Sequence, residues 1–148
     1  MPEPNNTRIV IASITSSEDQ ACLQCTLATP RWEIRFTRGL ADLSLAVRAT
    51  SSGVVISDRC LGDGSSWKDV LAILQGELEH PQLIVADRLA NEALWAEVLN
   101  LGGYDLLISP FEPDELHRIV SLAWEFRVRE ITRKRTDCSR PGVRVSAA

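Results

Sequence analysis

The sequence of 148 residues lacks any apolar run close to the roughly 18 to 20 residues that a membrane-spanning helix needs. Its first residues, MPEPNNTR, contain no basic segment followed by an apolar one, so we expect neither a secretory leader nor a membrane span, and a cytoplasmic location. Only four cysteines are present, too few for a dense disulfide framework in this length, so we expect reduced thiols. The hydrophobic fraction of 45% and charged fraction of 24% are typical of a globular domain and exclude a disordered or fibrous chain.

Positive charge is scarce in most of the chain. Residues 1–117 hold 8 Lys and Arg against 17 Asp and Glu, a net charge of −9, whereas residues 118–148 hold 8 against 3, a net charge of +5. The acidic body argues against a broad nucleic-acid surface, so no nucleic-acid partner is expected. Arg133, Lys134 and Arg135 either complement the dipole at the end of a helix or tether the chain to an acidic partner, a membrane surface or nucleic acid.

Apolar runs alternate with helical periods along the chain. The pattern predicts strands at residues 8–13, 32–37, 54–58, 82–86 and 104–109, and helices at 16–29, 40–51, 67–79, 90–101 and 113 to about 133. Five strands alternating with five helices indicate an α/β domain with a parallel sheet covered on both faces. We therefore expect a polar lead at residues 1–7, one domain at 8–131 and a basic disordered tail at 132–148.

One acidic residue stands where such folds build their sites. Asp58 ends the apolar run that starts at Val54, and a loop with Gly62, Asp63 and Gly64 follows it. In open α/β sheets the carboxyl ends of the strands border a crevice that carries the functional residues. Asp58 is therefore the leading candidate for a functional carboxylate.

The loop after Asp58 resembles the loop that follows the third strand of response-regulator receiver domains. The stretches LIVADR, NLGGYDLLISPF and EPDEL resemble the fourth strand, the fifth strand with its Pro-Phe turn, and the start of the last helix of that family. Roughly residues 8 to 131 can be aligned with it. The resemblance implies a flavodoxin-like, doubly wound sheet with strand order 2-1-3-4-5, a bacterial two-component context, and phosphorylation of Asp58 by a histidine kinase.

The remaining pocket positions of that family are replaced. The two acidic residues that hold Mg²⁺ fall on Ser13 and Ile14, the Thr or Ser of the fourth strand falls on Ala86, and the Lys of the fifth strand falls on Ser109. Leu106 stands where the family often carries an aromatic switch residue. Since losing one preorganised stabilising group typically costs about 10² to 10³ in rate, Asp58 should be a poor phosphoryl acceptor.

The favoured hypothesis is thus a pseudo-receiver: a non-enzymatic module without metal or cofactor that binds a protein partner, a histidine kinase or an output protein, independently of phosphorylation. A partner surface is suggested near the end of the last helix, at Trp124, Phe126, Arg127 and Arg129. The oligomeric state is left open.

Two alternatives remain. In the first, Asp58 is a working phosphoacceptor in a phosphorelay, and a kinase partner supplies the missing groups. Mg²⁺ is expected as a cofactor only in this case, with Asp87 able to lend a carboxylate near the metal. In the second, Cys22 and Cys25 form a redox or metal site. Redox CxxC pairs lie at the start of a helix, whereas this pair lies inside the predicted one, which favours a packing role.

Overall fold

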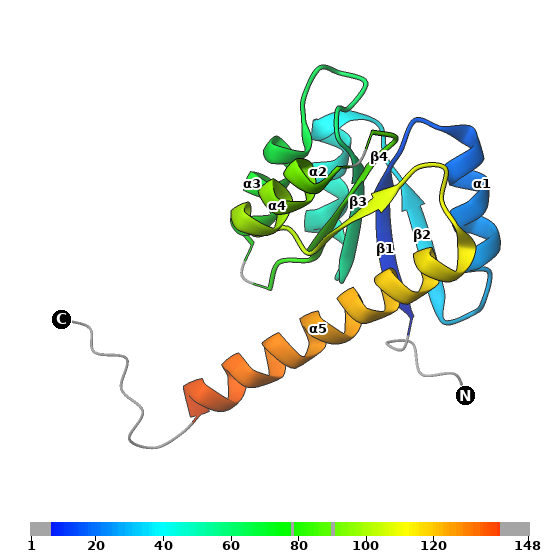
Figure 1. The fold of residues 1–148 in the computed structure, drawn as a ribbon. Coiled ribbons are helices and arrows are strands. Elements are labelled where there is room, and N and C mark those ends of the chain that lie inside the picture. Colours follow the sequence, from blue (N-terminus) through cyan, green and yellow to red (C-terminus); the bar gives the residue numbers. More distant parts are fainter. Residues whose placement is uncertain (1–6, 78, 90, 140–148) are drawn as a thin grey trace.

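Five parallel strands form one sheet in the order β2-β1-β3-β4-β5 (Figure 1). The computed structural model describes residues 7–77, 79–89 and 91–139. The strands are β1 (Arg8–Ser13), β2 (Trp32–Phe36), β3 (Val54–Asp58), β4 (Gln82–Asp87) and β5 (Asp105–Ile108). The helices are α1 (Ser17–Thr26), α2 (Gly39–Ala49), α3 (Trp67–Gln75), α4 (Glu92–Leu101) and α5 (Pro113–Ser139). The doubly wound α/β fold and its predicted strand order are confirmed.

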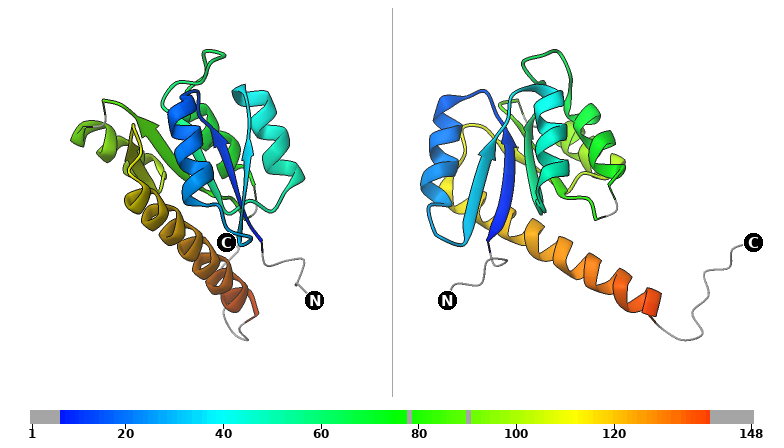
Figure 2. Two further views of the ribbon diagram at one scale, coloured as in Figure 1. Left: turned by 90° about the vertical axis from the view of Figure 1, so that its right-hand side faces the viewer. Right: turned by 180° about the vertical axis from the view of Figure 1, so that it is seen from behind.

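Helices cover both faces of the sheet (Figures 1 and 2). Along β1, Val10 and Ala12 face α1 and α5, whereas Ile11 between them faces the side of α2, α3 and α4. Side chains alternate between the two faces of a strand, so a strand buried on both faces needs an uninterrupted apolar run. The runs RIVIAS and VVIS meet this requirement.

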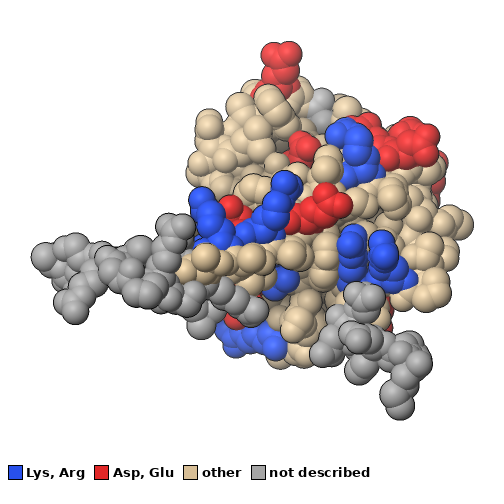
Figure 3. All heavy atoms as spheres, turned by 90° about the horizontal axis from the view of Figure 1, so that it is seen from below, with Lys and Arg blue, Asp and Glu red and all other residues tan. Residues whose placement is uncertain are grey.

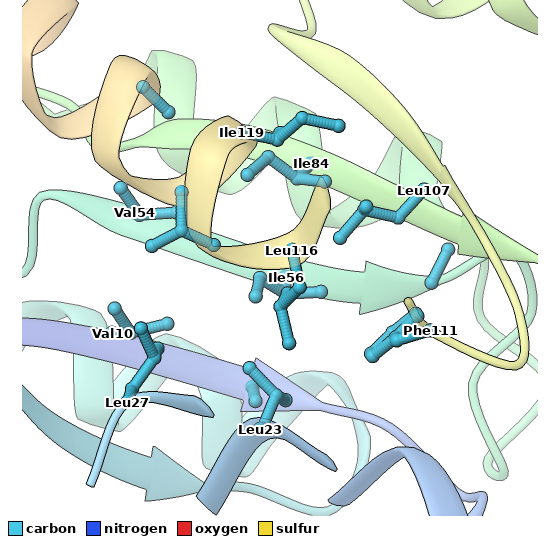
Figure 4. Close-up of a cluster of buried hydrophobic side chains, with 14 of the residues drawn as sticks. Val10, Leu23, Leu27, Val54, Ile56, Ile84, Leu107, Phe111, Leu116 and Ile119 are labelled. Carbon is cyan, nitrogen blue, oxygen red and sulfur yellow. The ribbon is translucent and has the colours of Figure 1, made fainter. Parts of the chain in front are cut away.

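The cluster beneath α1 and α5 is the larger of two hydrophobic cores (Figure 4). Leu116 and Val120 of α5 are fully buried against Val54 and Ile84 of the sheet, and Leu23 of α1 completes the contact. Burying one such aliphatic side chain contributes about 1.5 to 3 kcal/mol. This packing holds about the first three turns of α5 on the sheet.

Local capping groups set where several helices begin and end. The Asn91 side chain accepts a hydrogen bond from Leu94 N at 2.8 Å at the start of α4, and Ser66 with Asp69 forms a capping box on α3. Gly102 ends α4 in the left-handed conformation, at φ 110°. Such side chains accept hydrogen bonds from the free N–H groups of the first helical turn, and a left-handed glycine ends a helix by reversing the chain.

The last helix is longer than predicted. It continues through Ser139, so the expectation of an irregular tail from residue 132 is wrong for residues 132–139; residues 140–148 lie outside the described residues. The stretch TRKRTDCS contains no glycine or proline that would stop a helix, and an ion pair of 3.0 Å joins Glu130 to Arg133 one turn later. The absence of an apolar period removes packing partners but does not end a helix.

Two helices end three or four residues earlier than predicted. The first ends at Thr26, and α3 ends at Gln75, where the N–H of Gly76 bonds back to Ile73 O and Leu74 O. Hydrogen bonds to residues two and three positions earlier tighten the last turn and close the helix there. Among the described residues, no helix combines the length and the apolar composition that crossing a bilayer requires.

Candidate functional site

Asp58 lies at the carboxyl end of β3, the central strand, and pairs in register with Ala86 of β4. Its Oδ2 accepts hydrogen bonds from Thr15 N at 2.8 Å and from Thr15 Oγ1 at 2.9 Å. Thr15 follows β1, the neighbouring strand, so the parallel sheet brings the two residues together across 43 positions of sequence. The carboxylate is therefore held by neutral donors of the chain itself.

A second carboxylate lies behind it. Asp19, only 1% exposed, accepts a hydrogen bond from Phe111 N on Oδ1 at 3.0 Å and another from Ser109 Oγ on Oδ2. These contacts tie α1 to the loop between β5 and α5. Sequence reasoning placed Asp19 in the first helical turn as a partner of the helix dipole and missed this role, because the pattern Ser16-x-x-Asp19 is that of an ordinary helix start.

The mouth of the cleft carries an ion pair between Arg59 and Asp87, whose Nη1 and Oδ2 are 3.4 Å apart. Arg59 N also donates to Ala86 O at 3.0 Å. The cleft holds about 480 Å³ and is lined by Thr15, Ser16, Asp19, Asp58, Arg59, Cys60, Ala86, Asp87, Arg88 and Ser109. Asp87, considered as a metal-site carboxylate, thus has a cationic partner in the same cleft.

Burial raises the pKa of Asp58 above its usual value, and the nearby negative charges of Asp19 and Asp87 raise it further. The two hydrogen bonds from Thr15 act in the opposite direction because they stabilise the ionised form. The net direction is upward, since desolvation is the largest contribution. In the adjacent loop, hydrogen bonds from Ser65 and Leu40 lower the pKa of Asp63 to about 2.

The four replaced pocket positions divide between two clefts. Ala86 and Ser109 line the cleft of Asp58, whereas Ser13 and Ile14 line a neighbouring one of about 720 Å³ beside Phe36 and Gly39. Ile14 is 4% exposed and belongs to the core beneath α1 and α5. The segment after β1 therefore supplies Thr15, not a carboxylate, to Asp58.

These residues do not fit a magnesium ion. Mg²⁺ is bound through one or two carboxylates whose oxygens are free to coordinate it. Both oxygens of Asp19 already accept hydrogen bonds from Ser109 and Phe111, and Oδ2 of Asp58 accepts two from Thr15. Within residues 7–77, 79–89 and 91–139, no group of three or more His, Cys, Asp or Glu side chains is arranged to hold a metal.

The suggested partner residues on α5 point in different directions. Trp124 is half-buried against Trp32, with ring centroids 6.1 Å apart, and Phe126, 40% exposed, packs on Tyr104 at 5.6 Å. Arg127 is half-buried and donates to Glu79 O at 3.1 Å, while Arg129 is exposed. Trp124 and Arg129 line one cleft, whereas Arg127 lines another.

The cysteine pair lies in the interior of α1. Cys22 is half-buried, with its Sγ 3.7 Å from both Thr26 Oγ1 and Phe111 O, and Cys25 is exposed. Both are free thiols. Neither lies in the first helical turn, where the dipole would lower a thiol pKa.

No protein-family model matches the sequence, and no curated protein is significantly similar to it. Solved structures do resemble it. The signal receiver domain of an HD domain-containing protein from Pseudomonas fluorescens Pf-5 has a TM-score of 0.76 and 19% identity, covering 90% of this chain and 98% of its own. A response regulator from Thermotoga maritima has a TM-score of 0.70 and 17% identity, covering 80% and 98%.

A third similar structure is the anti-anti-sigma factor PhyR mutant from Bartonella quintana, with a TM-score of 0.66 and 16% identity. That match covers 83% of this chain and 50% of the other. The TM-scores of these three matches establish a shared fold, and at identities below 20% they establish no more than that. The strand order, the two helical layers and these neighbours together show that the chain has the fold of response-regulator receiver domains.

Proposed function

We propose that this chain is a signal-transduction module that keeps the receiver fold but binds its protein partner without phosphorylation of Asp58. The observation that carries the proposal is that residues of the chain itself already bind the carboxylates of Asp58 and Asp19. Thr15 occupies one oxygen of Asp58 with two hydrogen bonds, and Asp19 is tied to Ser109 and Phe111. The groups that a receiver uses on a phosphoryl group are replaced by contacts that stabilise the fold.

The charge balance of the cleft supports the same proposal. Phosphoryl transfer is promoted mainly by positioning and by neutralising the charge of the transferred group. Ser109 stands where the resemblance expects a lysine, and Arg59 is paired with Asp87. The three carboxylates of Asp19, Asp58 and Asp87 line the same cleft, so a phosphoryl group on Asp58 would be poorly neutralised there.

The alternative is a phosphoacceptor in a two-component phosphorelay. One observation favours it: Asp58 borders an open cleft of about 480 Å³, and Arg88 lines that cleft near it. Among the described residues, Oδ1 of Asp58 accepts no hydrogen bond. A histidine kinase would then have to supply the groups that the chain lacks. The cytoplasmic location and bacterial context remain predictions in both cases.

Intact-mass spectrometry separates the two functions. The chain, its Asp58→Asn variant and a matched Asp87→Asn variant are incubated with a small-molecule phosphodonor, with and without Mg²⁺, beside an ordinary receiver domain. We expect no adduct on this chain under conditions that label the ordinary receiver. An adduct of one phosphoryl group that requires Mg²⁺ and vanishes in Asp58→Asn would refute the proposal. Loss of that adduct in Asp87→Asn as well would assign Asp87 to the metal.

A further inference from the structure

Two tryptophans enclose an arginine at the edge of the sheet opposite to Asp58. The guanidinium of Arg8 lies 5.2 Å from the ring centroid of Trp32 and 5.6 Å from that of Trp124. Trp124 is seated on Gly53, where an added Cβ would lie 2.1 Å from its ring. Close packing fixes the rings, so the cation is held in place at the start of β1.

A cleft of about 390 Å³ opens beside this cluster. Its lining is Arg8, Trp124, Glu125, Val128 and Arg129, which come from the start of β1 and the middle of α5. Val128 is 43% exposed, and Trp124 is half-buried. The cleft therefore combines apolar surface from Trp124 and Val128 with two arginines and one glutamate.

Positive charge exceeds negative charge around the cleft. Arg31 is close enough to lower the pKa of Arg8, although burial lowers it more, and Glu125 acts against both. In the part of the chain that the structure describes, neither Arg8, Arg31 nor Arg129 forms an ion pair. Figure 3 views this face from below and shows its Lys and Arg in separate groups, with a few acidic side chains among them.

The end of α5 extends this surface away from the domain. Figures 1 and 2 show the helix passing beyond the lower edge of the sheet. Its projecting part carries half-buried Ile131 and exposed Lys134, with Arg133 paired to Glu130. An apolar and basic strip thus runs from the cleft along the helix.

We propose that this cleft and the projecting end of α5 form the docking surface for an acidic, amphipathic helix of a partner protein. An aliphatic side chain of the partner fills the space between Trp124 and Val128, and its carboxylates meet Arg8, Arg31 and Arg129. The inference rests on the proposed function and names its partner class. Since the surface lies at the start of the strands and Asp58 at their carboxyl ends, binding does not need a change at Asp58.

Charge argues for this occupant over two others. A second copy placed on the same surface by two-fold symmetry would bring like charges together. A nucleic acid has no aliphatic side chain to fill the space beside Trp124 and Val128, and the overall net charge of −4 weakens a contact dominated by phosphate neutralisation. A helix with carboxylates on one face and leucines on the other meets both the arginines and the apolar surface.

The test uses the full chain and a fluorescently labelled synthetic helix with Glu on its polar face and Leu on its apolar face. A matched peptide has Lys in place of Glu. At low ionic strength, anisotropy should show binding of the Glu peptide only, with loss on added salt. Reversing Arg31→Glu and Arg129→Glu together should weaken binding about tenfold or more. The control Arg38→Glu with Arg118→Glu, at exposed sites elsewhere, should change it less than about threefold.

Val128→Asp tests the apolar part separately and should also weaken binding, with circular dichroism confirming that each variant is folded. Equal binding by both double variants, no binding of the Glu peptide, or tighter binding of a single-stranded oligonucleotide or anionic vesicle would overturn the assignment. So would a dimeric mass of the free chain that Arg129→Glu abolishes. The Glu peptide could bind with an affinity that phosphodonor treatment changes in the wild type but not in Asp58→Asn. That result would confirm the docking surface and refute the proposal that binding is independent of phosphorylation.

Discussion

Asp19 should contribute more to stability than any helix-start carboxylate normally does. Asp19→Ala removes the hydrogen bonds from Ser109 Oγ and Phe111 N and leaves the buried Phe111 N–H without its acceptor. A hydrogen bond to a charged group contributes about 1.5 to 3 kcal/mol, so two contribute about 3 to 6 kcal/mol. Part of this is offset because the variant no longer buries a carboxylate, so we expect a net loss of about 2 to 4 kcal/mol.

Urea unfolding followed by circular dichroism measures this loss. With a slope of about 2 kcal/mol per molar urea, the midpoint should fall by about 1 to 2 M. Ser109→Ala keeps the bond to Phe111, removes the other bond to the carboxylate and should cost about 1.5 to 3 kcal/mol. The matched control is Glu18→Ala, one residue earlier and exposed, which loses only a dipole interaction of about 0.3 to 1 kcal/mol.

The comparison of Asp19→Ala with Glu18→Ala tests whether the buried hydrogen bonds of Asp19 stabilise the fold. If Asp19→Ala unfolds at the same urea concentration as Glu18→Ala, the bonds to the β5–α5 loop do not stabilise the fold. The claim that the hydrogen bonds of Asp19 to Ser109 and Phe111 serve stability instead of phosphorylation would then be refuted.

Two further predictions concern Gly53 and Asp58. Gly53→Ala should destabilise the domain by about 1 to 3 kcal/mol in the same urea assay, because its Cβ would overlap Trp124, whereas Gly62→Ala, with open space around it, should stay near wild type. For Asp58, burial places the folded-state pKa above the unfolded one, so its favourable contribution is present below the unfolded pKa and is lost as pH rises through the folded pKa. As pH is raised from about 3 to about 7, the free energy of unfolding of Asp58→Asn should therefore rise relative to that of the wild type. A fall relative to the wild type over the same range would contradict the direction of the pKa shift.

The strands and most helices could be predicted because their causes are local. Buried parallel strands require continuous apolar runs such as VVIS, and Asn91 and Gly102 mark the two ends of α4. The end of α5 could not be predicted in this way. Its last turns have neither an apolar period nor a stop residue, so the sequence pattern does not distinguish a solvated helix from an irregular tail.

The candidate site was predictable only in its central residue. Asp58 stood out because it ends an apolar run and precedes a glycine-containing loop. Its hydrogen-bond partner Thr15 is 43 positions away, and Asp19 meets Ser109 and Phe111 across 90 and 92 positions. Nothing in the local pattern around Thr15 or Asp19 indicates these contacts.

The sequence by itself determined the alternation of strands and helices, the covering of the sheet on both faces, and the position of Asp58 at a strand end, since each depends on neighbouring residues. Only the tertiary structure decided which side chains surround that carboxylate and that Arg8 lies between Trp32 and Trp124. The reason is that parallel strands bring together segments far apart in the chain, and the contacts depend on strand register and helix packing.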